Sequence, residues 1–152
     1  MKMTGVWQPG TGNQWWASGL TPAAFESKNQ EYLKQGLRIA CADFTDGLVA
    51  AAWRPGTGAE YWFSGSVDAA LAQDKVHMAQ GLRLAALSAH DAGVFCIWRA
   101  GTGVQWWNVG LSEADFKTAD AKHFADGFRL VAVDELNGKF TALWRPGSGA
   151  QW

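Results

Sequence analysis

The chain has 152 residues, with 13 basic and 14 acidic side chains that give a formal net charge of −1. This length is enough for one domain with a buried core. The balanced, interspersed charge gives no reason to expect nucleic acid or an anionic membrane as a partner. Its apolar runs are far shorter than a bilayer span, and its first ten residues lack the apolar stretch of a secretory signal. We therefore expect a cytoplasmic protein by default, with secretion open if the chain is part of a longer one.

Metal and disulfide chemistry find little support in the sequence. Cys41 and Cys96 stand at non-matching positions of the repeat described below, which favours two small buried thiols over a disulfide. His77, His90 and His123 are scattered, and no cysteine–histidine spacing matches a zinc ligand set. We expect no metal and no cofactor.

One tryptophan recurs with a period of about 46 residues. The four copies are Trp7, Trp53, Trp98 and Trp144. A second marker has the same period, because "QGLRI", "QGLRL" and "DGFRL" start at positions 35, 80 and 126. These markers predict a single repeat domain over residues 1–152, with repeats at about 4–48, 49–93 and 94–140 and a closing half-repeat at 141–152.

Each repeat begins with two strand-like runs around a glycine turn. The first run is apolar and aromatic, as in "LVAAAWR", "VFCIWR" and "KFTALWR". It ends at Pro-Gly-Thr-Gly or a close variant, whose residues favour a turn. A second aromatic run follows, such as "QWWASG" or "EYWFSG". We expect the two runs to pair as a β-hairpin across the turn.

A helix and a third strand complete the repeat. Thr21, Ser66 and Ser112 are suitable helix N-caps, and Gly36 stands where a helix-terminating glycine belongs. The strand "LRIACADF" and its copies then reach the next hairpin through short polar turns. The predicted fold is β-rich α+β: three repeats of hairpin, helix and strand, arranged as pseudo-threefold antiparallel lobes with intervening helices. An N-terminal hairpin, Thr4 to Trp16, would lack its own third strand, and such an edge predicts a homodimer.

These repeats pair a Gly-[Leu/Phe]-Arg-[Leu/Ile] strand with an aromatic strand that ends in tryptophan. In this they resemble the bacterial tandem-repeat domain of polyglycine hydrolases, over essentially the whole chain. The resemblance implies a lobed, non-catalytic domain beside a separate β-lactamase-like serine hydrolase domain. The chain has no Ser-x-x-Lys, the nucleophile motif of that class, so the activity is not carried over.

Catalytic motifs are lacking in the repeats themselves. The polar residues that break the repeat, Glu60, His90 and Glu135, differ in type and position. The glycine turn also lacks the Lys-Ser or Lys-Thr of a phosphate loop. We assign no catalytic residue, and a small hydrolase with a site between lobes remains an alternative.

The tryptophans fall into two groups. The copy that ends each apolar strand is expected in the core, with its indole N–H bonded to a carbonyl. Adjacent pairs follow each turn: Trp15–Trp16, Tyr61–Trp62 and Trp106–Trp107. Neighbouring strand residues face opposite sides, so one ring of each pair packs inward. The other either packs on its own helix or is exposed on a rigid hairpin, where it would suit a sugar or a peptide.

Polar residues beside these pairs complete the candidate sites. A glutamine or glutamate before each pair could bind sugar hydroxyls, and an arginine before three of the turns flanks accessible backbone. The candidate ligand-binding residues are Gln14, Trp16, Arg54, Glu60, Trp62, Arg99, Gln105, Trp107, Arg145 and Gln151.

A second arginine set has a structural interpretation. Its members are Arg38, Arg83 and Arg129, and they recur in phase with Asn29, Asp74 and Asp120, with which we expect them to pair. The predicted function is a non-catalytic, multivalent, lectin-like binding module. The alternative is a peptide- or protein-recognition module that accompanies a hydrolase.

Overall fold

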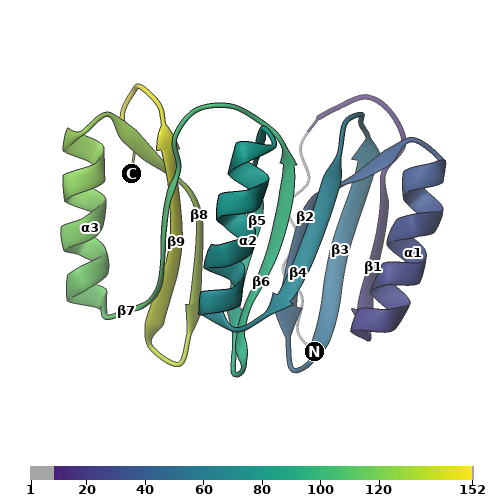
Figure 1. The fold of residues 1–152 in the computed structure, drawn as a ribbon, viewed down its shortest axis with the longest axis horizontal. Helices are drawn as coiled ribbons and strands as arrows, with labels where there is room; N and C mark the ends of the chain where they lie inside the picture. The colour runs from purple at the N-terminus through teal and green to yellow at the C-terminus, as the bar shows by residue number, and fades with distance from the viewer. Residues whose placement is uncertain (1–8, 152) are drawn as a thin grey trace. The chain divides into compact units, whose positions relative to one another are not determined.

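The computed structural model describes residues 9–151 and divides into two compact units, one ending at Gly58 and the other beginning at Ala59. The units hold three lobes, each made of a three-stranded antiparallel sheet and one helix (Figure 1). Lobe 1 belongs to the first unit, and lobes 2 and 3 belong to the second. The predicted β-rich α+β fold with three lobes is confirmed.

The elements recur in the same order in every lobe. Lobe 1 comprises β1 (Trp15–Leu20), α1 (Pro22–Lys34), β2 (Leu37–Thr45) and β3 (Leu48–Pro55). Lobe 2 comprises β4 (Glu60–Gly65), α2 (Val67–Ala79), β5 (Leu82–His90) and β6 (Gly93–Ala100). Lobe 3 comprises β7 (Trp106–Leu111), α3 (Glu113–Ala125), β8 (Phe128–Leu136) and β9 (Lys139–Pro146). None of the helices in residues 9–151 is both long and apolar enough to cross a bilayer.

The strand pairing corrects the predicted hairpin. The sheets have the orders β1–β3–β2, β4–β6–β5 and β7–β9–β8, so the strand that ends in the repeated tryptophan is central. The aromatic run after each glycine turn joins the next sheet, and β4 pairs with β6 rather than with β3. The hairpins instead join β2 to β3, β5 to β6 and β8 to β9. At the first of these, Asp46 and Gly47 both have positive φ, as a two-residue hairpin turn requires.

Lobe 1 has a complete sheet, because β1 pairs with β3 and places Trp15 opposite Trp53. The second run of the expected N-terminal hairpin, β1, therefore lies in a complete sheet, and the open edge from which we expected a homodimer is not found there. The first run of that hairpin, before residue 9, lies outside the described residues.

The predicted helix signals are confirmed. The side chains of Thr21, Ser66 and Ser112 each accept a hydrogen bond from the backbone N–H three residues later, at 3.2, 3.3 and 3.1 Å. These bonds satisfy N–H groups that have no partner within the first helical turn. Gly36 follows α1 with φ of 75°, a conformation that glycine adopts without strain.

The repeated tryptophan forms the centre of each lobe's core. Trp53, Trp98 and Trp144 are completely buried, as predicted, whereas Trp7 lies outside the described residues. In lobe 1, α1 packs Phe25 and Tyr32 against Trp53, with ring centroids 6.0 and 5.0 Å away.

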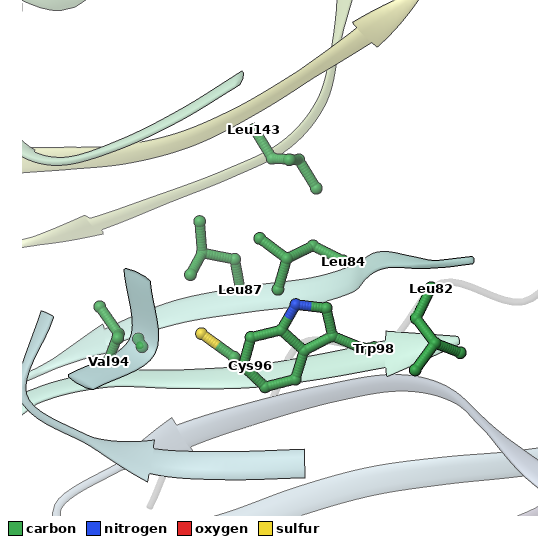
Figure 2. Packing of buried hydrophobic residues seen from close by; sticks show 8 residues of the cluster. Leu82, Leu84, Leu87, Val94, Cys96, Trp98 and Leu143 are labelled. Atoms are coloured by element: carbon green, nitrogen blue, oxygen red, sulfur yellow. The ribbon is translucent and has the colours of Figure 1, made fainter. Parts of the chain in front are cut away.

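Lobes 2 and 3 share one hydrophobic cluster. Its buried members from lobe 2 are Ala70, Leu82, Leu84, Leu87, Val94, Cys96 and Trp98 (Figure 2). Leu143 of β9 in lobe 3 packs against these residues and is itself buried. β5 also contacts β8 and β9 directly. The two lobes are therefore joined by apolar packing as well as by the connecting turn.

Candidate functional site

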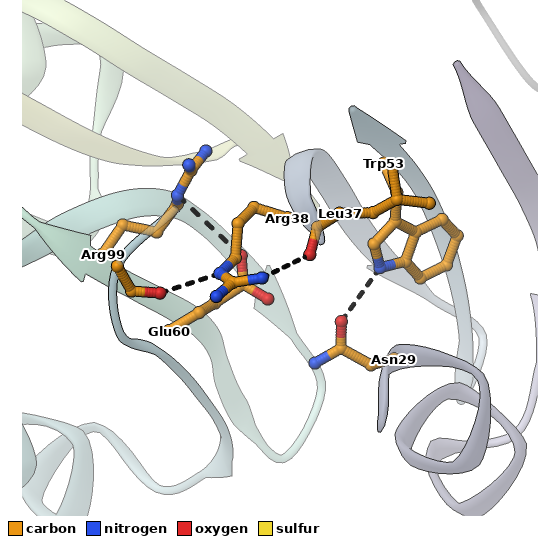
Figure 3. Close-up of polar contacts among 7 residues, drawn as sticks. Asn29, Leu37, Arg38, Trp53, Glu60 and Arg99 are labelled. Atoms are coloured by element: carbon orange, nitrogen blue, oxygen red, sulfur yellow. Dashed lines mark hydrogen bonds and ion pairs between the residues drawn. The ribbon is translucent and has the colours of Figure 1, made fainter. Parts of the chain in front are cut away.

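A repeated hydrogen bond ties the central tryptophan of each lobe to the helix of the same lobe. The indole Nε1 donates to Asn29 from Trp53, to Asp74 from Trp98 and to Asp120 from Trp144, at 2.9, 2.8 and 2.9 Å (Figure 3 shows the first). We expected the indole to reach a carbonyl. Trp53 does reach the side-chain carbonyl of Asn29, whereas Trp98 and Trp144 reach a carboxylate oxygen. These helix residues fix the tryptophan ring, so their predicted pairing with the second arginine set is wrong.

That arginine set instead holds the glycine turn. Arg38 donates from Nε to the carbonyl of Gly58 and from Nη1 to the carbonyl of Leu37, both at 2.8 Å (Figure 3). The same Nε bond runs from Arg83 to Gly103, and from Arg129 to Gly149 at 2.7 Å. These arginines have a structural role, because their guanidinium groups fasten the turn that leads out of each sheet.

Asp74 is a hydrogen-bonding centre between lobes 2 and 3. Besides Trp98, its carboxylate accepts from Gln105 Nε2 at 2.8 Å and from Trp107 Nε1 at 3.0 Å. Gln105 Oε1 in turn accepts from the backbone N–H of Leu84 at 3.0 Å. The structure thus places two predicted ligand-binding residues, Gln105 and Trp107, at an internal contact between lobes.

Arg145 and Gln151 lie beside the outer edges of neighbouring strands. Arg145 donates to the carbonyl of Leu84 on β5, and burial, followed by repulsion from Arg83, lowers the pKa of its guanidinium. Gln151 accepts from the N–H of Leu130 at 3.0 Å and donates to its carbonyl at 2.7 Å. Both predicted residues bind backbone that the sheet leaves unpaired.

The remaining predicted polar residues form two pairs. Gln14 Oε1 accepts from Arg54 Nε and Nη2 at 2.9 and 2.7 Å, and both residues are exposed. The carboxylate of Glu60 lies 3.9 Å from Arg99 Nε in an ion pair whose glutamate side chain is buried (Figure 3). The polar residue before the aromatic pair therefore has a protein partner in both cases.

The second aromatics of the pairs differ from lobe to lobe. Trp16 is 59% exposed, whereas Trp62 is half-buried with its ring 5.8 Å from Phe95. Trp107 is half-buried and bonded to Asp74. This position does not offer one common surface in all three lobes.

The first aromatic of each pair does offer a common surface, which the sequence analysis missed. Trp15, Tyr61 and Trp106 are 49%, 48% and 52% exposed, and we call these three rings the aromatic platforms. Each ring stacks on an aromatic side chain of its own helix: Trp15 on Tyr32, Tyr61 on His77 and Trp106 on His123, at 6.2, 4.9 and 6.0 Å. The in-phase recurrence of these three helix aromatics was the signal that could have identified the platforms.

The surroundings of the platforms differ in charge. In lobe 3, burial and then Lys122 lower the pKa of His123, against the smaller opposing effects of Asp126 and Asp120. This shift favours the neutral form of the ring beneath Trp106. In lobe 1, the ammonium of Lys28 lies 5.1 Å from the centre of the Tyr32 ring. The shared feature is thus the stacked ring pair, and the polar neighbours vary.

A serine–histidine contact in lobe 2 does not have the chemistry of a nucleophile and its base. Ser64 Oγ lies 3.2 Å from His90 Nε2, while His90 Nδ1 accepts from the N–H of Ala92 at 3.2 Å. A neutral imidazole that accepts at Nδ1 carries its proton on Nε2. Nε2 then donates to Ser64 and cannot take the hydroxyl proton, which a general base must do.

The thiols also differ from expectation, because Cys41 is exposed and only Cys96 is buried. Within residues 9–151, no three histidine, cysteine or acidic side chains gather in an arrangement that could hold a metal ion.

Comparison with protein families supports the repeat interpretation. The family model of the polyglycine hydrolase-like structural repeat matches residues 12–45 and 107–146, which confirms the resemblance in two regions of the chain. These regions contain β1, α1 and β2 of lobe 1 and nearly all of lobe 3. No curated protein and no solved structure matches the chain.

Proposed function

We propose that the protein is a non-catalytic multivalent binding module whose ligand-binding surfaces are the three aromatic platforms. One observation carries this proposal: the same position in every lobe holds a half-exposed ring stacked on a helix aromatic. An isolated exposed aromatic would need no explanation, but three at one repeat position share a structural cause.

A carbohydrate is the ligand class that this arrangement favours. Each platform ring is held between its strand and the ring beneath it, so binding a flat apolar face costs little side-chain entropy. A sugar ring has such a face, and its hydroxyl groups can bond with different polar neighbours in each lobe. Lys28 could serve in lobe 1, for example, where it lies over Tyr32.

Because the platform occurs in three lobes, a ligand that binds each platform weakly could still bind the whole protein with useful affinity. A polymer that reaches two platforms binds the second one intramolecularly, which raises the overall affinity by roughly 10²–10⁴ where the geometry permits. A repeating polysaccharide is therefore a better ligand than a single sugar.

The second candidate is an extended peptide. It is favoured by the match to a polyglycine hydrolase-like structural repeat, a name that connects the repeat with a peptide substrate. Stacked rings can cover the face of a peptide chain as well as that of a sugar. A glycine-rich peptide is the corresponding probe.

Arrays of glycans and of peptides, including oligoglycine, test the two candidates with the whole protein. Binding is then quantified by tryptophan fluorescence, to which the exposed Trp106 contributes directly. We expect Trp106→Ala to weaken polysaccharide binding by roughly tenfold through lost avidity. The triple variant Trp15→Ala, Tyr61→Ala and Trp106→Ala should abolish binding.

Trp16→Ala is the matched control. Trp16 adjoins Trp15 in β1 and is similarly exposed, but it occupies the other position of the pair. At protein concentrations at which chains do not associate, it should leave ligand binding unchanged. Equal losses in Trp15→Ala and Trp16→Ala would contradict the assignment to the platforms. Binding of oligoglycine alone would favour the peptide candidate, and no binding on either array would end the proposal.

A further inference from the structure

The contact between lobes 2 and 3 shows how one lobe caps the open edge of another. β5 is an edge strand, and the backbone N–H and carbonyl of its Leu84 point away from β6. The turn before β7 satisfies the N–H through Gln105, and lobe 3 satisfies the carbonyl through Arg145. Trp107 reaches across to Asp74 on α2, at 3.0 Å. Unpaired strand edges attract partners, and here the partner is the next lobe.

Lobe 1 carries the same capping residues, but they are exposed. At the repeat positions of Trp107 and Arg145, lobe 1 has Trp16 and Arg54, which we call the head surface. Both residues are exposed, and Arg54 bonds to Gln14. The head surface thus presents on lobe 1 the counterparts of two residues that make the contact of lobe 3 with lobe 2.

Lobe 3 carries the residues that such a head would cap. The counterparts of Asp74, Leu84 and Leu87 are Asp120, Leu130 and Val133, which we call the tail surface. Leu87 is 6% exposed beneath lobe 3, whereas Val133 is 52% exposed. Covering the tail surface would therefore bury apolar side-chain area that is now exposed to solvent.

The polar groups of the tail surface are also only partly used. Asp74 accepts from three side chains, whereas among the described residues Asp120 accepts from Trp144 alone. Gln151 stands at the position of Gln105, but its Nε2 donates to the carbonyl of Leu130 rather than to the helix aspartate. The counterpart of that carbonyl in lobe 2, the carbonyl of Leu84, accepts from Arg145 in the internal contact.

We infer that the head surface of one molecule docks on the tail surface of a second copy and repeats the contact between lobes 2 and 3. Trp16 donates to Asp120, as Trp107 does to Asp74. Arg54 leaves Gln14 and takes the carbonyl of Leu130, and the amide of Gln151 turns to Asp120. Val133 becomes covered, as Leu87 is.

The intermolecular contact is weaker than its internal template. Ala52 of lobe 1 replaces Leu143, which fills the shared core in lobe 3. Asp134 of lobe 3 accepts from the N–H of Ala89 at 2.8 Å, but the corresponding pair would place Asp43 beside Glu135. We therefore expect reversible, concentration-dependent association. Because the two surfaces differ, the contact is heterologous, and it builds open chains or closed rings.

Sedimentation and light scattering of the full chain across a micromolar concentration series test the inference. The wild-type mass should rise above that of one chain. Trp16→Ala and Val133→Lys, one on each surface, should each raise the dissociation constant by about tenfold or more, because each removes or charges a central contact. Circular dichroism confirms that each exposed substitution leaves the fold intact.

Two matched controls distinguish this contact from nonspecific association. Trp15→Ala removes a similarly exposed ring whose counterpart Trp106 stays exposed in lobe 3, beside the template contact. Val131→Lys adds the same charge to β8 at a position that is also 52% exposed, and its counterpart Ala85 remains exposed in lobe 2. Both variants should associate like the wild type.

A mixing experiment identifies the heterologous geometry. Trp16→Ala retains a working tail and Val133→Lys retains a working head, so an equimolar mixture should form a complex of two chains that stops there. Complete failure of the mixture to associate would overturn the inference, as would a wild-type mass that stays at one chain. Association sensitive to Trp16→Ala but not to Val133→Lys would indicate a different, head-to-head contact and would also overturn it.

Discussion

Asp74 holds three side chains in place, because its buried carboxylate accepts hydrogen bonds from Trp98, Gln105 and Trp107. Removing it leaves three inward-facing donors without their acceptor. We expect Asp74→Ala to lower the free energy of unfolding by about 3–5 kcal/mol. Asp120→Ala, which removes the acceptor of one indole, should cost about 1–3 kcal/mol. Urea denaturation measures both, and equal losses would contradict the role of Asp74 as a shared centre.

Cys96 is expected to lower the stability of the folded protein at alkaline pH. Burial, and secondarily Asp74, raise the pKa of this thiol to about 12 from 9.0. Above pH 9 the unfolded chain therefore loses the Cys96 proton while the folded chain keeps it. The contribution of Cys96 to stability is complete below pH 9 and falls by about 1.4 kcal/mol per pH unit until the folded pKa is reached.

Denaturant midpoints measured between pH 8 and 11 check this effect. Cys96→Ala should lose that part of the alkaline slope, whereas Cys41→Ala, at an exposed position, should retain it. A slope unaffected by Cys96→Ala would show that other groups cause the alkaline instability.

Among the elements, the β5–β6 hairpin has the strictest backbone requirement. Gly93 has φ of 145°, and a Cβ atom there would lie 2.0 Å from the carbonyl oxygen of Gly65. Both the strained conformation and the collision oppose any side chain. We expect Gly93→Ala to cost about 2–4 kcal/mol. Gly138→Ala, in the corresponding hairpin of lobe 3, meets no atom within 4 Å.

Gly138→Ala should lower the free energy of unfolding only by the strain of a positive φ, about 1–2 kcal/mol. Thermal unfolding of the two variants measures the difference between them. A Gly93→Ala protein as stable as Gly138→Ala would mean that β4 and β6 can separate at low cost.

The elements were predictable because their signals are local. Thr21, Ser66 and Ser112 act on the next few residues, and alternation within a strand depends on backbone geometry. Pairing across the glycine turn was not predictable in this way. Pro-Gly-Thr-Gly resembles a hairpin turn, but Arg38 and its counterparts hold it so that the chain leaves the sheet. A hydrogen bond between residues far apart in the sequence thus holds the turn from which the chain passes to the next sheet.

The candidate site was harder to predict than the fold. Sequence alternation showed that the two rings of each pair face opposite sides, but it could not show which side is covered. Trp107 is covered because Asp74, 33 positions earlier, accepts its indole proton. Trp106 remains open on its own helix. Choosing between them required the contact between lobes, which no local pattern contains.

For the whole molecule, the lobes should differ in local stability. Leu84 and Leu87 of β5 are buried beneath lobe 3, whereas their counterparts in β8 are partly or largely exposed. Segments with fewer buried contacts open at lower free energy. Hydrogen exchange at low protein concentration should therefore be faster in β8 than in β5. Equal protection of the two strands would contradict the expected stabilisation of β5 by lobe 3.

The turn that leaves each sheet has a consequence for how such a protein can change length. Residues 145–151 dock on lobe 3 through the same glycine carbonyl and the same backbone N–H that residues 99–105 use on lobe 2. Trp98 and Trp144 are each followed by arginine. Deletion of residues 99–144 would join Trp98 to Arg145, keep the Trp-Arg sequence intact and leave lobe 2 followed by an equivalent segment. The reverse event would add a lobe, so genes for this architecture can gain or lose whole lobes in single steps while each remaining sheet keeps all three strands.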